Sequence, residues 1–195
     1  MVEYFGKSNG GKTQLAMQAV LCAAQAGARA LFIDTEGTFR PERLEGMAKA
    51  RGWDAGNLLD RVVYVRTGSS SEQMETVRMM GRREATASCK LVAVDTLTRN
   101  FSVEMPGRSN LAGRQGALNV HLSEMARDSF LNARAYVLTN RVTFGPTHVV
   151  GIGGRTVEQL VHAAVRLDRE GDSLRGTLVP GGESRVARVG ESGVD

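Results

Sequence analysis

One octapeptide near the start of the chain restricts the possible folds more than any other feature. Residues 6–13 read Gly-Lys-Ser-Asn-Gly-Gly-Lys-Thr, which matches the pattern G-x-x-x-x-G-K-T. An apolar stretch over residues 2–5 precedes it, and residues 12–26 carry apolar side chains at helical spacing. A strand, a glycine-rich loop and a helix N-terminus in this order predict an anion site, because backbone N–H groups point at the ligand.

The residue types in this loop predict a site for a nucleoside triphosphate with Mg²⁺. Lys12 supplies a positive charge for the β- and γ-phosphates, and the hydroxyl of Thr13 is a Mg²⁺ ligand. The alternative is a glycine-rich strand-to-helix turn that carries a lysine by chance. The residues assigned to ATP binding here are Gly6, Lys7, Ser8, Asn9, Gly10, Gly11, Lys12, Thr13 and Gln14.

Length and composition are those of one globular domain. The chain has 195 residues, of which 42% are hydrophobic and 24% charged, with no apolar run of membrane-spanning length and no signal peptide. A formal charge of +4 permits nucleic-acid binding without showing it. Cys22 and Cys89 lie in apolar stretches without metal-ligand spacing, which predicts buried, reduced thiols of an intracellular protein.

Predicted strands and helices alternate along most of the sequence and give way to strands at the C-terminal end. Helices are expected over residues 12–26, 42–51, 71–87, 111–132 and 157–163. Strands are expected over residues 2–5, 29–34, 62–66, 91–95, 135–140, 165–168, 174–178 and 185–189. Residues 98–113 and 141–154 are predicted loops. This order predicts an α/β fold, with a mostly parallel sheet flanked by helices and antiparallel strands at the C-terminal end.

Carboxylates stand at the ends of two predicted strands. Asp34 ends one apolar run and is followed closely by Glu36, whereas Asp95 ends the run Leu-Val-Ala-Val. Ligands of open α/β sheets bind at the carboxyl ends of the strands. An apolar run that ends in aspartate is a Walker B pattern, so Asp95 joins Thr13 as a candidate Mg²⁺ ligand.

These motifs, in this order, resemble the ATPase core of the RecA/RadA recombinase family, on its archaeal and eukaryotic branch. The resemblance rests on Gly-Lys-Thr-Gln at 11–14, Ile-Asp-Thr-Glu-Gly-Thr-Phe-Arg-Pro-Glu-Arg at 33–43, Val-Asp-Thr-Leu-Thr at 94–98, Gly-Arg at 107–108, Leu-Ala-Gly-Arg-Gln at 111–115, Leu-Thr-Asn at 138–140 and Gly-Gly at 153–154. The resemblance covers nearly the whole chain. The run at 33–43 is far more specific than the octapeptide at 6–13, a P-loop pattern that many families share. It implies a RecA-like P-loop NTPase fold, as a single domain over residues 1–195.

The resemblance also implies roles for particular residues around the nucleotide. Glu36 would be the general base that polarises the attacking water, and Lys12 and Arg141 would complete the catalytic set. Arg43 would lie near the adenine, where its planar guanidinium can stack. The alternatives are a helix-entry carboxylate near Pro41 for Glu36 and a solvated helix arginine for Arg43.

Two loops of the family line the filament axis and contact DNA, and residues 98–113 and 141–154 correspond to them. The DNA-binding candidates that the resemblance implies are Arg108, Ser109, Arg114, Thr143 and Gly153. Arginine at such sites contacts phosphate without reading sequence. For Arg114, a salt bridge on the helix surface is the alternative.

Several positions depart from the family pattern. Arg141 stands where the family usually has a glutamine that senses the γ-phosphate, and Ser102 where it often has an arginine. The second loop is short, and residues 179–182 lack the Asp-Ser-Pro element that caps ATP on the neighbouring subunit. The family's N-terminal DNA-binding domain and polymerisation segment are not found in residues 1–195. These departures favour a regulatory paralogue of RadA.

The sequence as a whole predicts an ATP-binding, Mg²⁺-dependent and DNA-dependent ATPase of the RecA/RadA type, acting in homologous recombination and DNA repair. Its cofactors would be ATP and Mg²⁺, and its partners single-stranded DNA and either a second copy or a RadA-type recombinase, in the cytoplasm near the nucleoid. One alternative is a regulatory paralogue with weak hydrolysis and no strand exchange. The other is a RecA-fold signalling ATPase without a DNA role, which the arginines of the first loop argue against.

Overall fold

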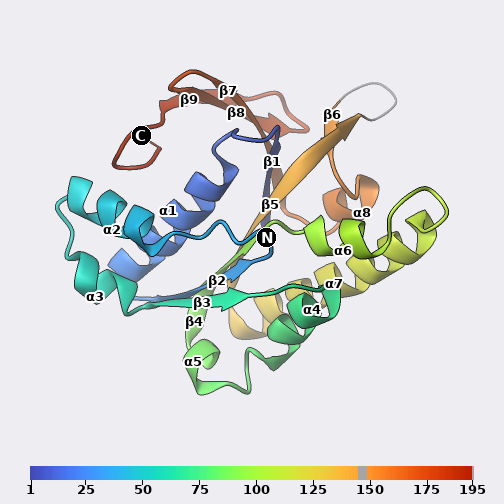
Figure 1. Cartoon of the computed structure of the whole chain (residues 1–195), viewed down its shortest axis with the longest axis horizontal. Helices are drawn as coiled ribbons and strands as arrows, with labels where there is room; N and C mark the ends of the chain where they lie inside the picture. Colours follow the sequence, from blue (N-terminus) through green and yellow to red (C-terminus); the bar gives the residue numbers. More distant parts are fainter. Residues whose placement is uncertain (145–148, 195) are drawn as a thin grey trace.

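The computed structural model describes residues 1–144 and 149–194, which form a sheet with helices on both faces (Figure 1). Its strands are β1 (Val2–Gly6), β2 (Arg29–Asp34), β3 (Val62–Arg66), β4 (Cys89–Asp95), β5 (Ala135–Phe144), β6 (Val149–Gly151), β7 (Ala163–Glu170), β8 (Ser173–Val179) and β9 (Ser184–Arg188). Its helices are α1 (Lys12–Gln25), α2 (Pro41–Ala50), α3 (Ala55–Leu59), α4 (Ser70–Met79), α5 (Glu84–Ala87), α6 (Arg99–Glu104), α7 (Leu111–Asn132) and α8 (Arg155–Glu158).

The strand order across the sheet is β3-β2-β4-β5-β1-β7-β8-β9, and β6 pairs with β5 outside this path. From β3 to β7 every neighbouring pair is parallel, whereas β8 and β9 add antiparallel strands at one edge. This arrangement confirms the predicted α/β fold with a mostly parallel sheet. It also brings the carboxyl ends of the parallel strands to one edge, because in register Asp34 pairs with Asp95 and Gly6 pairs with Arg141.

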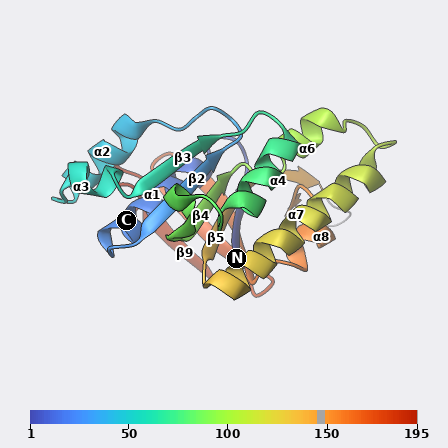
Figure 2. The same cartoon turned by 90° about the horizontal axis from the view of Figure 1, so that it is seen from below.

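The alternation of side chains along the strands divides the core into two layers. Phe32 and Ala93 face one side, where they pack with residues of α1, α2 and α3. Ile33 and Val94 face the other side, where they pack with residues of α4, α6 and α7. Figure 2 shows α4 and α7 on this second face. Because the central strands are buried on both faces, they read as continuous apolar runs in the sequence.

Proline, glycine and serine residues mark three of the helix ends. Pro41 occupies the first turn of α2, and Gly27 has the positive φ of 86° that favours glycine after a helix. At the start of α4, the Ser69 hydroxyl accepts a hydrogen bond from the backbone N–H of Glu72 at 3.1 Å. These local signals mark the end of α1 and the starts of α2 and α4, because each acts within one helical turn.

The expected helix over residues 71–87 is wrong, because the structure breaks it into α4 and α5. The break contains Gly81, the residue with the highest helical cost after proline. Thr86 then donates its hydroxyl to the Met80 carbonyl at 2.8 Å, which stabilises the turn between the two helices. The Met80 side chain is buried in the second core layer.

The two predicted loops contain regular structure. Residues 99–104 form α6, because Phe101 is buried against the second core layer and Pro106 follows soon after the helix end. In the second loop, β5 continues to Phe144 and pairs with β6 as an antiparallel hairpin, in register from Val142–Gly151 to Phe144–Val149. Residues 145–148 of this loop lie outside the described residues. Both segments were predicted as loops because glycine and proline residues interrupt them.

Three smaller expectations also need correction. The helix expected over residues 157–163 lies earlier, as α8, and Ala163 already belongs to β7. The short helix α3 was not predicted, although Asp54 caps it by accepting a hydrogen bond from the Asn57 N–H. Cys89 is buried as expected, but Cys22 is exposed because it points outward from α1. No helix among the described residues is long and apolar enough to cross a membrane.

Candidate functional site

The glycine-rich loop follows β1 at the edge where the parallel strands end. Gly6 and Gly10 are buried, and a Cβ at Gly6 would lie 2.4 Å from the Leu167 carbonyl oxygen, so no larger residue fits there. Gly11 adopts a φ of 80° just before α1, in the left-handed region that favours glycine. The first turn of α1 has no acidic residue and no side-chain cap, so its backbone N–H groups are available to an anion.

Lys12 lies under this loop with its side chain buried. Its Nζ donates to the carbonyl oxygens of Gly6 at 3.0 Å and Lys7 at 2.6 Å. Burial lowers the pKa of the ammonium, whereas the nearby charge of Asp95 opposes that shift. Because its hydrogen-bond partners in the described part of the chain are neutral carbonyl oxygens, this ammonium is not neutralised by an ion pair and is available to a polyanion at the loop.

Thr13 and Asp95 lie together, as a Mg²⁺ site requires. The Thr13 hydroxyl donates to Asp95 Oδ2 at 2.8 Å, and the Thr139 hydroxyl donates to Asp95 Oδ1. Burial raises the pKa of Asp95, and both hydroxyl hydrogen bonds favour its ionised form. Among the described residues no group of three or more histidine, cysteine, aspartate or glutamate side chains could hold a metal ion. One carboxylate and one hydroxyl suit Mg²⁺, which keeps several waters.

The loop that carries Glu36 is held by Asp34. Both oxygens of this buried carboxylate accept backbone N–H groups, from Glu36 at 2.9 Å, Gly37 at 2.7 Å and Phe39 at 3.1 Å. Such a turn, in which a strand-end aspartate binds the amides that follow, keeps the loop in one conformation. Asp34 therefore acts on the position of Glu36 and is not a candidate ligand itself.

Glu36 contacts Arg141, the residue at the departure from the family pattern. Arg141 Nη2 lies 2.7 Å from each carboxylate oxygen of Glu36, and the Thr96 hydroxyl donates to Oε1 at 2.9 Å. The three residues come from the loops after β2 and β4 and from β5 itself. The tertiary structure therefore joins two members of the predicted catalytic set, Glu36 and Arg141, close to the phosphate-binding loop.

A buried polar network links β1 to the hairpin formed by β5 and β6. Asn140 Nδ2 donates to Glu3 Oε1 and to the Ile152 carbonyl, both at 2.7 Å, and the Thr98 hydroxyl donates to Asn140 Oδ1 at 2.7 Å. A Cβ at Gly151 would lie 2.6 Å from Glu3 Oε1, so the close approach of hairpin and carboxyl depends on glycine. Burial raises the pKa of Glu3 to about 7, and the charge of Glu158 adds to the shift.

The buried carboxyl of Glu3 makes stability depend on pH. Between about pH 4.5 and 7 the folded chain keeps a proton on Glu3 that the unfolded chain has lost, so stability falls as pH rises through this window. Across this pH window we expect the free energy of unfolding of the wild type to fall by up to about 3 kcal/mol more than that of Glu3→Gln, since one pKa unit corresponds to about 1.4 kcal/mol. Urea unfolding of both proteins at pH 5 and pH 7.5 measures the difference. Parallel profiles would mean that folded Glu3 is ionised throughout.

Arg43 lies beside the first turns of α1 and contacts the C-terminal segment. Its Nε donates to Gln14 Oε1 at 3.1 Å, and Nη1 and Nη2 donate to the carbonyl oxygens of Glu191 and Gly190. The segment is also fixed by Gln18, which exchanges two hydrogen bonds with the backbone of Val194. Arg43 is therefore a positioned guanidinium, not a solvated one, and its stacking on adenine stays a prediction.

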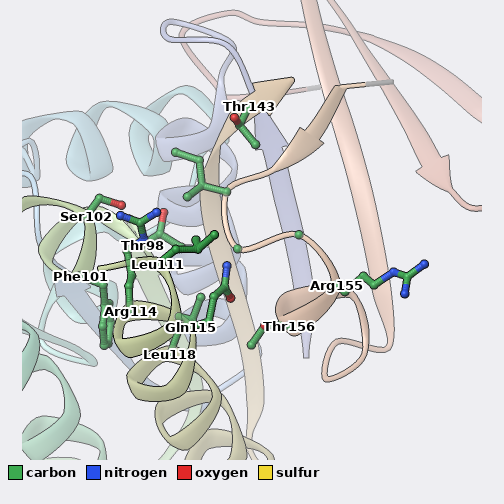
Figure 3. A pocket seen from close by; sticks show the side chains of 13 residues that line it. Thr98, Phe101, Ser102, Leu111, Arg114, Gln115, Leu118, Thr143, Arg155 and Thr156 are labelled. Carbon is green, nitrogen blue, oxygen red and sulfur yellow. The ribbon is translucent and has the colours of Figure 1, made fainter. Parts of the chain in front are cut away.

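A groove of about 540 Å³ lies between α6, α7 and the base of the hairpin (Figure 3). Among the residues that line it are three predicted DNA-binding residues, Arg114, Thr143 and Gly153. Arg114 Nη1 donates to the Met105 carbonyl at 2.7 Å, in place of the carboxylate contact that a salt bridge would give. Arg155 also lines the groove, but Figure 3 shows its side chain pointing away from the other labelled residues.

Two further DNA-binding candidates, Arg108 and Ser109, lie outside this lining. They occupy the exposed turn between α6 and α7, next to the groove in the sequence but not among its lining residues. The structure therefore brings together part of the predicted set and leaves these two on a neighbouring surface. Their contact with DNA stays a prediction.

Comparison with known proteins places this geometry in a family. The family model described as Rad51 matches residues 1–160 of the chain. The chain belongs to the Rad51 family. The DNA repair and recombination protein RadA of Ignicoccus hospitalis is 34% identical over 205 residues, which cover 97% of this chain and 60% of that relative. The chain thus spans about 60% of the length of the RadA relative it matches.

Several residues of this Rad51-family site were not predicted as site residues. Thr96 and Thr139 hold the carboxylates of Glu36 and Asp95 through their hydroxyls, and Glu3 holds Asn140. A threonine directly after the Walker B aspartate was visible in the sequence, but its partner was not. Glu3 shares a face of β1 with Phe5, because side chains two residues apart in a strand point the same way, and both are buried.

Proposed function

We propose that the chain is an ATP-binding domain that hydrolyses ATP with Mg²⁺ and responds to single-stranded DNA, in recombination and repair. The observation that carries the proposal is the meeting of three features at one sheet edge. One site contains the glycine-rich loop with buried Lys12, the Thr13–Asp95 pair and Glu36. Strand β5 connects this site to the groove between α6, α7 and the hairpin, because Thr143 of β5 lines that groove. RadA, the protein of recombination and repair that the chain resembles, supports the biological setting.

The chain's own residues would divide the chemistry among them. The loop amides and Lys12 would bind the phosphates, and Thr13 and Asp95 would hold Mg²⁺ with its waters. Bound Mg²⁺ neutralises charge on the transferred phosphoryl group. Glu36 would orient a water and accept its proton at a carboxylate oxygen. Asp34 and Thr96 keep that carboxylate in place, and Arg141 stays a predicted member of the catalytic set.

A regulatory protein with slow turnover is the second candidate function. The ion pair between Arg141 and Glu36 favours it, because both oxygens of the proposed base face a cation. In this form the domain would bind ATP and act on a full recombinase without exchanging strands itself. ATP turnover with and without single-stranded DNA separates the two functions. Strong stimulation by DNA supports the first, whereas slow turnover that DNA does not change supports the second.

Binding to single-stranded DNA should be electrostatic and should depend on exposed arginines. We expect the affinity for a labelled oligonucleotide to fall as the salt concentration rises. Arg108→Ala should lower the affinity, and it should make the negative slope of log K against log salt shallower by about 0.7. Fluorescence anisotropy at several salt concentrations measures both quantities. Arg82→Ala is the control, since Arg82 is equally exposed on the distant turn between α4 and α5. An unchanged slope in Arg108→Ala would remove Arg108 from the DNA contacts.

A further inference from the structure

The contact between Arg141 and Glu36 joins residues 105 positions apart in the sequence. Arg141 Nη2 lies midway between the two carboxylate oxygens, at 2.7 Å from each, and Thr96 donates a further hydrogen bond to Oε1. The Glu36 side chain is 19% exposed and that of Arg141 51% exposed, so the carboxylate is the more enclosed partner. Both oxygens of Glu36 thus face donors from the protein.

This arrangement weakens Glu36 as an acceptor of protons from water. A general base acts through an oxygen lone pair that points at the water, and charge-assisted hydrogen bonds occupy lone pairs on both oxygens here. The guanidinium stays protonated in proteins, so Arg141 cannot itself take the proton. A neutral side chain at this position would leave the negative charge of the carboxylate uncompensated and available.

Arg141 also lies within range of the phosphate-binding loop. Its backbone pairs with Gly6, the first residue of that loop, and its charge contributes to the lowered pKa of Lys12. Its carbonyl accepts the Ile152 N–H at 2.9 Å, so the residue belongs to the base of the hairpin. The guanidinium therefore has a second anionic partner within reach whenever phosphates occupy the loop.

We propose that Arg141 is a positioning residue that holds Glu36 in a resting pose, so that turnover requires the guanidinium to leave the carboxylate. This inference rests on the proposed ATPase function. Because the pair is half exposed on the arginine side, releasing it costs only about 0.2–1 kcal/mol, as for other exposed ion pairs. Arg141 is thus a restraint on the rate of hydrolysis and not a block.

Turnover of position-141 variants tests the restraint. We expect Arg141→Gln to raise kcat at saturating ATP by roughly 1.4- to 5-fold, with little change in KM. This factor is the free energy of breaking the Arg141–Glu36 ion pair, converted into a ratio of rates. Arg141→Lys keeps a positive charge opposite Glu36 but loses the planar guanidinium, so its kcat should lie between those of the wild type and Arg141→Gln. The control is Arg78→Gln, because the Arg78–Glu124 pair has the same 2.7 Å length and similar exposure but lies between α4 and α7.

A readout independent of turnover tests the contact itself. In the protein without nucleotide, a double-mutant cycle of Arg141→Gln and Glu36→Gln in urea unfolding should show a coupling of roughly 1.4- to 5-fold in the unfolding constant. A merely structural role for Arg141 would give this coupling without the rise in kcat. Absent coupling, or a kcat in Arg141→Gln at or below that of wild type, overturns the proposal.

Failure of the proposed function is distinguishable from failure of this inference. A wild-type protein that does not bind a fluorescent ATP analogue contradicts the proposed function and the restraint together. A wild-type protein that binds the analogue, with Arg141→Gln no faster than wild type, contradicts the restraint alone. A fall in kcat on Arg141→Gln would assign Arg141 to the phosphate in place of Glu36.

Discussion

Replacing Glu36 with glutamine is expected to lower ATP turnover by roughly 10²–10⁴-fold, the usual cost of removing a general base. The amide keeps the size of the side chain and can still accept the Thr96 hydroxyl hydrogen bond, but it cannot accept a proton from water. Nucleotide affinity should stay near the wild-type value, because Glu36 holds neither the loop nor Asp95. Steady-state turnover and equilibrium binding of a fluorescent ATP analogue separate the two effects.

The control for this change is Glu42→Gln, which removes an exposed carboxylate from the first turn of α2, six residues further along the chain. It should leave both turnover and affinity unchanged. If Glu36→Gln turns over ATP at the wild-type rate, another group positions the water, and the carboxylate at the end of β2 serves only the structure of its loop.

Replacing Lys12 with alanine is expected to abolish detectable nucleotide binding. Each charge-assisted hydrogen bond contributes about 1.5–3 kcal/mol, or roughly 10- to 150-fold in affinity, and the β- and γ-phosphates would share this ammonium. The buried position of Lys12 strengthens the effect, because water cannot replace the lost charge easily. Isothermal titration with ATP and Mg²⁺ measures the loss directly.

Two comparisons make the result specific to the phosphate-binding loop. Lys49→Ala removes a lysine from α2 that pairs with Glu45 in solvent, and it should bind nucleotide like the wild type. Thermal unfolding of Lys12→Ala without nucleotide should show that the loop still folds, since the hydrogen bonds of Lys12 go to the carbonyls of Gly6 and Lys7 within the loop itself. Unchanged ATP affinity in a folded Lys12→Ala protein would contradict the assignment of the loop.

Much of the site was predictable because its chemistry lies in short runs. The loop at residues 6–13 carries its own glycines, lysine and threonine, and the apolar run of β4 ends at its aspartate. The alternation of strands and helices then required the ends of the parallel strands to meet at one edge. The contact of Thr13 with Asp95 follows from these patterns, and the structure confirms it.

The loops were less predictable, for physical reasons that differ between them. Phe101 makes α6 a helix only because the second core layer receives its side chain, and no local periodicity shows that. The hairpin of β5 and β6 exists because residues 142–144 pair with residues 149–151, which lie further along the chain. Gly81 breaks the helix over residues 71–87 although the polar pattern continues through it.

By itself the sequence determined the family and the fold class and predicted the phosphate-binding residues, because short motifs and the local pattern of each strand and helix can be read from it. Only the tertiary structure decided which side chains act on one another across the sheet. Arg141 meets Glu36 across 105 residues, and Asn140 meets Glu3 across 137. Such contacts depend on strand order and register, since β5 lies between β4 and β1, and neither property is encoded in any local stretch of the chain.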